Sequence, residues 1–147
     1  MIRHLASVTE IVEDVETAVR FYREVLGLEV EFEPGSPYAQ IKLAGSLHYG
    51  LWARRAAAET VFGDANAVDR VPLGFSVGFE VETVADAERE LAGQAWPILQ
   101  PRRQEPWGQV TSRFYSPSGA LCEVAETPWA RRLSQPLQAE AEAAAAA

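Results

Sequence analysis

The feature that most constrains this fold is an internal repeat. Residues 7–20 (SVTEIVEDVETAVR) match residues 76–89 (SVGFEVETVADAER), which begin 69 positions later, and half of the fourteen aligned residues are identical. A second match, with an offset of 74, pairs residues 44–50 (AGSLHYG) with 118–124 (SGALCEV). Two units of about seventy residues are too long and too few for a solenoid. We therefore expect one pseudo-symmetric domain in which equivalent positions of the two units meet at one site.

Each unit carries the same order of predicted elements. In the first, a strand over 3–12 precedes a helix that is capped by Asp14 and ends at Gly27, and short strands follow near 28–33, 38–44 and 47–53. In the second, a strand near 73–81 precedes a helix capped by Thr83, with strands near 97–100, 109–116 and 120–126. The predicted class is α+β, with two β-α-β-β-β modules.

These elements give a single domain over residues 1–126. Module one spans 1–54, an Ala-rich and then polar linker with a short helix spans 55–72, and module two spans 73–126. The remaining residues, 127–147, form an Ala/Glu-rich tail with little to bury. We expect the tail to be a surface helix or disordered.

Composition excludes several classes of function. The formal net charge is −8 and no basic stripe is present, which disfavours nucleic-acid binding. No run is long enough to span a membrane, and the first residues are too charged for a signal peptide. Cys122 is the only cysteine, so an intramolecular disulfide is impossible and a reducing cytoplasm is the expected location.

Local patterns add to the repeat. The first helix carries Asp14, Ala18, Phe21 and Tyr22 and ends in the Leu-Gly pair at 26–27, and the second module closes with Pro117, Gly119, Leu121 and Glu123. With the paired modules, these residues make the chain similar to the vicinal oxygen chelate superfamily, which includes glyoxalases, bleomycin-resistance proteins and extradiol dioxygenases. The resemblance covers residues 1–126. It implies a half-open mixed sheet whose two halves enclose a ligand in a cleft.

The resemblance also implies where a divalent metal would bind in the family's enzymes. It places the ligand positions at Ser7, Ser76, Glu123 and a residue near Tyr49, and the repeat pairs the same positions. Only Glu123 is of the expected type, because a serine hydroxyl is a weak ligand for zinc, nickel, manganese or iron. We therefore expect no metal and no other cofactor.

Neither histidine is expected to replace the missing ligands. His4 is three residues from Ser7, and His48 adjoins Tyr49, so in regular strands each points to the face opposite its neighbour. Glu10 has the parity of the helix-covered face. We expect it beside an arginine at a module or subunit junction, because an unpaired buried carboxylate is costly.

Without a metal, the implied cleft suits a flat, partly apolar molecule. Trp52 and Trp107 are the expected aromatic walls. The expected polar ligand-binding residues are Ser7, Thr9, Tyr49, Ser76, Arg113 and Glu123. Glu123 has two interpretations: a lone carboxylate with a raised pKa, or the partner of Arg113 in an ion pair.

Three functions follow from this sequence. The first is metal-independent binding of a small hydrophobic or aromatic molecule, as in bleomycin-resistance proteins, with no catalytic residue. The second is a metal-dependent lyase, isomerase or extradiol-type dioxygenase, which would require His4 or His48 to reach Glu123. The third is a metal-free lyase or epimerase with Glu123 as base and Tyr49 as acid. The expected assembly is a homodimer.

Overall fold

The computed structural model describes residues 1–46, 48–129 and 142–146. Within them, eight strands form one mixed sheet in the order β2-β3-β4-β1-β5-β8-β7-β6. The strands are β1 (Ile2–Val12), β2 (Glu29–Glu31), β3 (Tyr38–Lys42), β4 (Tyr49–Ala53), β5 (Gly74–Val81), β6 (Gln100–Gln104), β7 (Val110–Tyr115) and β8 (Leu121–Glu126). The helices are α1 (Val15–Arg20), continued by a π-helical turn (Phe21–Val25), α2 (Arg54–Phe62), a 3-10 turn (Ala67–Arg70) and α3 (Val84–Gly93).

The two modules meet along the antiparallel pair β1 and β5, where Val8 lies opposite Val77. These residues are 69 positions apart, as are the matched segments, so the pseudo-twofold axis passes through this pair. Each central strand then pairs in parallel with the last strand of its own module, β1 with β4 and β5 with β8. The predicted fold of two β-α-β-β-β modules in a half-open mixed sheet is confirmed.

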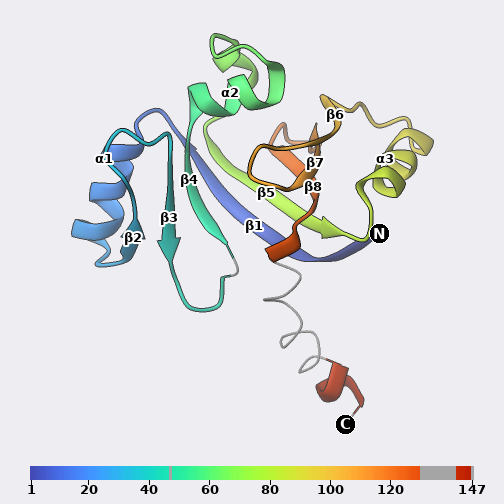
Figure 1. The fold of residues 1–147 in the computed structure, drawn as a ribbon, viewed down its shortest axis with the longest axis horizontal. Helices are drawn as coiled ribbons and strands as arrows, with labels where there is room; N and C mark the ends of the chain where they lie inside the picture. The colour runs from blue at the N-terminus through green and yellow to red at the C-terminus, as the bar shows by residue number, and fades with distance from the viewer. Residues whose placement is uncertain (47, 130–141, 147) are drawn as a thin grey trace.

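Helices α1 and α3 cover the two flanks of the sheet (Figure 1). Helix α1 packs against β3 and β4, and α3 against β6, β7 and β8. The predicted caps are both present: the Asp14 carboxylate accepts from the Glu16 N–H, and the Thr83 hydroxyl accepts from the Asp86 N–H. Under α1, Glu10 accepts a hydrogen bond from the Tyr22 hydroxyl, a partner within the chain that the sequence did not predict.

Helix α2 occupies the segment between the modules and closes one end of the sheet (Figure 1). Its buried Ala57 and Ala58 pack with Ile11 of β1 and with Val71. The small alanine side chains allow the helix to lie close to the strands.

Strands β2, β3 and β4 are each about two to three residues shorter than predicted, and β6 differs most from the prediction. Strand β6 spans Gln100–Gln104 rather than 97–100, and it contains Pro101. Proline cannot donate a ladder hydrogen bond, and β6 tolerates it because it is the edge strand of the sheet. Within the predicted tail, residues 142–146 are helical, and residues 130–141 and 147 lie outside the described part of the chain.

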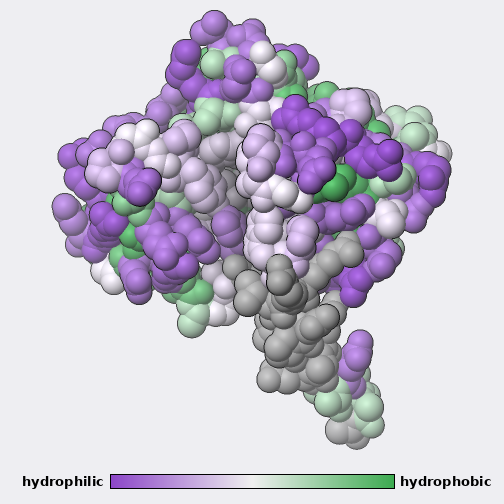
Figure 2. All heavy atoms as spheres, viewed as in Figure 1, coloured by the Kyte–Doolittle hydropathy of each residue, from purple (hydrophilic) through white to green (hydrophobic). Residues whose placement is uncertain are grey.

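Hydrophilic residues dominate the face of the molecule seen in Figure 2, with only small hydrophobic patches between them. Among the described residues, no helix combines the length and apolar character that crossing a membrane requires.

Candidate functional site

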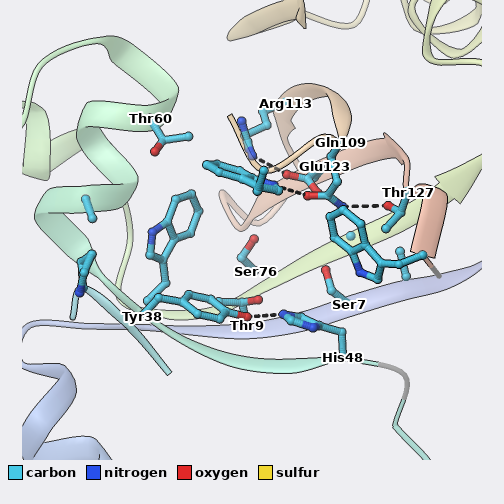
Figure 3. Close-up of a pocket in the computed structure, with 17 residues that line it drawn as sticks. Ser7, Thr9, Tyr38, His48, Thr60, Ser76, Gln109, Arg113, Glu123 and Thr127 are labelled. Carbon is cyan, nitrogen blue, oxygen red and sulfur yellow. Dashed lines mark hydrogen bonds and ion pairs between the residues drawn. The ribbon is translucent and has the colours of Figure 1, made fainter. Parts of the chain in front are cut away.

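A cavity of about 520 Å³ lies over the central strands and is closed on one side by α2 (Figure 3). Every predicted binding residue except Tyr49 lines it: Ser7, Thr9, Trp52, Ser76, Trp107, Arg113 and Glu123. The two modules therefore contribute equivalent residues to one concave face, as Ser7 and Ser76 illustrate. The volume is in the range of small-molecule sites.

Tyr49 lies on the opposite face of the sheet, where its ring contacts Tyr22 and Phe75. Strand pairing gives the reason. Val8 pairs with Tyr49 and Val77 with Cys122, so in the strands Tyr49 corresponds to Cys122 with an offset of 73.

The offset of 74 holds only in the preceding turns, where Gly45 and Gly119 both have positive φ angles. Module one therefore has one more residue than module two between the turn glycine and the strand. A change of one residue moves a side chain to the other face of a sheet. As a result, His48 lines the cavity and Tyr49 does not.

The position equivalent to Glu123 is consequently Gly50, since Thr9 pairs with Gly50 as Gly78 pairs with Glu123. The Tyr38 side chain occupies the space above Gly50, and a Cβ there would collide with its ring and hydroxyl. Tyr38 thus occupies the space that a side chain at position 50, the equivalent of Glu123, would otherwise fill.

Gly78 allows the polar groups of the two modules to approach. A Cβ on Gly78 would collide with the Ser7 hydroxyl and would lie 3.6 Å from Glu123 Oε1. The Ser7 hydroxyl and the Glu123 carboxylate therefore converge over this glycine (Figure 3).

Arg113 links the polar side chains on the module-two side of the cavity, which we call the polar wall. Its side chain is only 2% exposed, and its guanidinium forms ion pairs with Glu105 and Glu123, both at 2.6 Å. It also donates to the Gln100 side chain and, at 3.3 Å, to Thr111. The ion pair that the sequence allowed between Arg113 and Glu123 is present.

The two carboxylates differ in proton affinity. Burial tends to raise the pKa of Glu105, but hydrogen bonds from Arg113, Thr111 and Arg103 outweigh it and hold that pKa below its usual range. Burial raises the pKa of Glu123, and the Arg113 charge offsets this effect only in part. Arg113 is shared with Glu105, so Glu123 remains the more easily protonated acceptor.

Tyr38 and His48 form a polar pair on the module-one wall. Their rings are stacked with centroids 5.8 Å apart, and the Tyr38 hydroxyl is hydrogen-bonded to His48 Nε2. Burial, then the nearby Lys42 charge, lowers the pKa of His48. Burial, then the Glu123 charge, raises the pKa of Tyr38. Both side chains are therefore neutral near pH 7.

Three tryptophans line the cavity: Trp52, Trp107 and Trp129. The Arg113 guanidinium carbon lies 5.8 Å from the centroid of the Trp52 ring, within range of a cation–π contact. Trp107 and Trp129 are 47% and 37% exposed. Trp96 is outside the cavity, and its indole donates to the Tyr115 carbonyl.

Sequence reasoning missed Tyr38, His48, Gln109, Thr127 and Trp129 as cavity residues. The alternation of β3 places Tyr38 on the face opposite the buried Ala39 and Ile41. The sequence does not show that this face of β3 lines a cavity, because that depends on the pairing of β3 with β4. For Trp129 no pattern in the sequence indicated a position beside the cleft.

The residues at the family's metal positions do not fit a divalent metal. They are two hydroxyls (Ser7 and Ser76), a glycine (Gly50), and one carboxylate that is already bound by Arg113. Divalent transition metals favour imidazole, thiolate or several carboxylates. Among the residues that the structure describes, no group of three or more His, Cys, Asp or Glu side chains is placed to bind a metal ion.

Comparison with solved structures finds the same fold in distant relatives. A glyoxalase/bleomycin resistance protein/dioxygenase superfamily member from Vibrio splendidus is 18% identical with a TM-score of 0.59, over 84% of this chain and 100% of that one. Methylmalonyl-CoA epimerase from Mycobacterium tuberculosis is 20% identical with a TM-score of 0.59, over 85% and 88%. A variant of the Streptomyces coelicolor epimerase, in complex with 2-nitronate-propionyl-CoA, is 14% identical with a TM-score of 0.57, over 87% and 99%.

No curated protein sequence matches the chain. The family comparison is more direct, because one family model matches residues 4–124, which include both modules and the cavity strands. The chain belongs to the Glyoxalase/Bleomycin resistance protein/Dioxygenase superfamily.

Proposed function

We propose that this protein binds a small planar aromatic molecule in its central cavity without a metal ion. The observation that carries the proposal is the cavity lining: Trp52 and Trp107 come from different modules and share one concave face with a few polar groups. Apolar pockets with a small number of converging polar groups are typical of small-molecule sites.

The polar groups suit a ligand that donates a hydrogen bond. Arg113 binds Glu123 through Oε2. The other oxygen, Oε1, is on the side of Ser7 and Gly78. A ring N–H or a protonated amine directed at this oxygen would be held while the ring lies against the tryptophans. A ligand cation is favoured because Glu105 already balances the charge of Arg113.

The test is a fluorescence titration of the purified protein with 9-aminoacridine, a planar cationic tricyclic amine. We expect saturable binding that weakens at least tenfold in Trp107→Ala and in the milder variant Trp52→Phe. Trp96→Ala is the matched control, because Trp96 is part-exposed but outside the cavity. Absence of saturable binding, or equal loss in the control, would contradict the proposal.

A second candidate is metal-free proton transfer with Glu123 as base. The raised pKa of Glu123 and the neutral Tyr38–His48 pair in the same cavity favour it. Tyr38 takes the place of Tyr49 as the acid, and the fold neighbours include methylmalonyl-CoA epimerases. The probe is 2-tetralone in D₂O: enzyme-dependent exchange of its acidic C–H, lost in Glu123→Gln, would support this activity, and exchange at the buffer rate would exclude it for this probe.

We derive no metal-dependent step, because the donor set does not fit a metal. His48 reaches the cavity, but it is hydrogen-bonded to Tyr38 rather than placed with Glu123. His4 does not line the cavity.

We also propose a homodimer and a reducing, cytoplasmic location. Apolar side chains on the outside of the described fold support a dimer, among them Leu5, Phe21, Val25, Leu73 and Phe75. The buried free thiol of Cys122 is compatible with a reducing compartment.

A further inference from the structure

Trp129 follows the last strand and lies beyond residues 4–124, which the family model matches. It nevertheless lines the cavity. The ring lies near Gly108 in the β6–β7 turn (residues 105–109), where an added Cβ would be 4.0 Å from its Cζ3. Trp107 belongs to the same turn, so two separate segments each bring an indole to the cavity near this turn.

A chain of hydrogen bonds ties these two segments together. The Trp107 indole N–H donates to Gln109 Oε1 at 2.7 Å, and Gln109 Nε2 donates to the Thr127 hydroxyl at 2.7 Å (Figure 3). The Thr127 backbone N–H donates to the buried Glu80 carboxylate at 2.8 Å. Gln109 therefore uses both ends of its amide to hold Trp107 in place relative to the segment that leads into Trp129.

Backbone hydrogen bonds and a salt bridge stabilise the β6–β7 turn. Glu105 N–H donates to the Gln109 carbonyl at 2.7 Å, and Gly108 N–H donates to the Glu105 carbonyl at 2.9 Å. The Glu105 side chain binds Arg113, which also holds Glu123. The orientation of Trp107 is thus coupled to the same ion-pair network that forms the polar wall.

Both indoles are partly exposed although each lines a cavity, at 47% for Trp107 and 37% for Trp129. Large apolar surfaces left open beside a polar-lined cavity mark a place where a ligand completes the packing. Trp52 and the Glu123–Arg113 pair line the same cavity and are less exposed than these two indoles.

We propose that Trp129, which closely follows the Thr127 that Gln109 ties to Trp107, selects for extended fused-ring ligands by covering their outer ring. This inference rests on the proposed binding function and deepens it by naming the ligand class as polycyclic, with Gln109 as a positioning residue. Trp129 contributes contact to a third ring and none to a single ring.

The test uses a matched series of cationic heteroaromatic amines: 4-aminopyridine, 4-aminoquinoline and 9-aminoacridine, with one, two and three fused rings. Dissociation constants are measured for the full-length wild type, Trp129→Ala, Gln109→Leu and the control Trp96→Ala. We expect Trp129→Ala and Gln109→Leu to weaken 9-aminoacridine about tenfold and to change 4-aminopyridine less than twofold. Unchanged melting temperatures exclude a general loss of structure.

A uniform loss across the series would overturn the inference, since it would mean a structural or electrostatic role for Trp129. No loss with any probe would overturn it as well, while leaving the proposed function intact. Failure of the wild type to bind any member contradicts the proposed function and this inference together.

Discussion

At Gly50 and Gly78 the absence of a Cβ leaves space that side chains of the cavity occupy. Gly50 makes room for Tyr38, and Gly78 lets the Ser7 hydroxyl approach Glu123. Neither stands out in the sequence, because a glycine within a strand gives no sign of what lies above it. The polar wall thus depends on close backbone approach, which only the folded structure reveals.

Substituting Gly50 tests the role of Tyr38. Gly50→Ala should displace the Tyr38 ring, break its hydrogen bond to His48 and lower the free energy of unfolding by about 1–3 kcal/mol. Chemical denaturation measures this change. Gly93→Ala at the end of α3 is the control, since a Cβ there meets no atom within 4 Å. Equal stability of Gly50→Ala and wild type would mean that Tyr38 is not fixed by this contact.

Glu105 gives a pH-dependent prediction. Folding lowers the pKa of Glu105, so its ionised form stabilises the fold above its ordinary value of 4.5, and that contribution disappears as the pH falls through the lowered pKa. Glu105→Gln should therefore cost about 3 kcal/mol at pH 7, since it leaves the buried Arg113 poorly compensated.

The loss should shrink as the pH falls through the lowered pKa of Glu105, because the wild-type carboxylate is then itself protonated. Denaturant melts at several pH values measure the difference, with the exposed Glu24→Gln as a control for net charge. A destabilisation that stays constant with pH would contradict the ion-pair explanation.

At the level of elements, the sequence was sufficient for most of the architecture. The repeat and its alternating patterns predicted the strand-helix order, and Asp14 and Thr83 were correctly assigned as caps. The predicted register of β4 was wrong by one residue, because module one has an extra residue between Gly45 and the strand. Tyr49 therefore lies outside the cavity and His48 lines it. A turn can absorb an extra residue without a change of pattern, so the register becomes visible only from strand pairing.

Helix α2 offers a test of how tightly the cavity is closed. Ala57 is fully buried against the strands, so Ala57→Leu should overpack this contact and lower the free energy of unfolding by about 1–3 kcal/mol. Glu59→Leu introduces the same side chain at an exposed position of α2 and should have little effect. If the thermal unfolding curves of the two variants coincide, α2 packs loosely on the sheet.

For the molecule as a whole, the two modules of one chain already form a continuous sheet and one cavity. The proposed homodimer is therefore not needed to complete the cavity walls described here. Light scattering at micromolar concentration should give about twice the chain mass of 16.1 kDa. A mass equal to one chain would contradict the dimer and leave the binding proposal unaffected.

The central claim, binding without a metal, is tested most directly by calorimetric titration of 9-aminoacridine into EDTA-treated protein, with and without added nickel, zinc, manganese or iron(II). Because two hydroxyls, a glycine and an arginine-bound carboxylate occupy the family's metal positions, we predict saturable binding whose dissociation constant is unchanged by any of these ions. Binding that appears only when one of the ions is restored, together with stoichiometric uptake of that ion, would contradict the account.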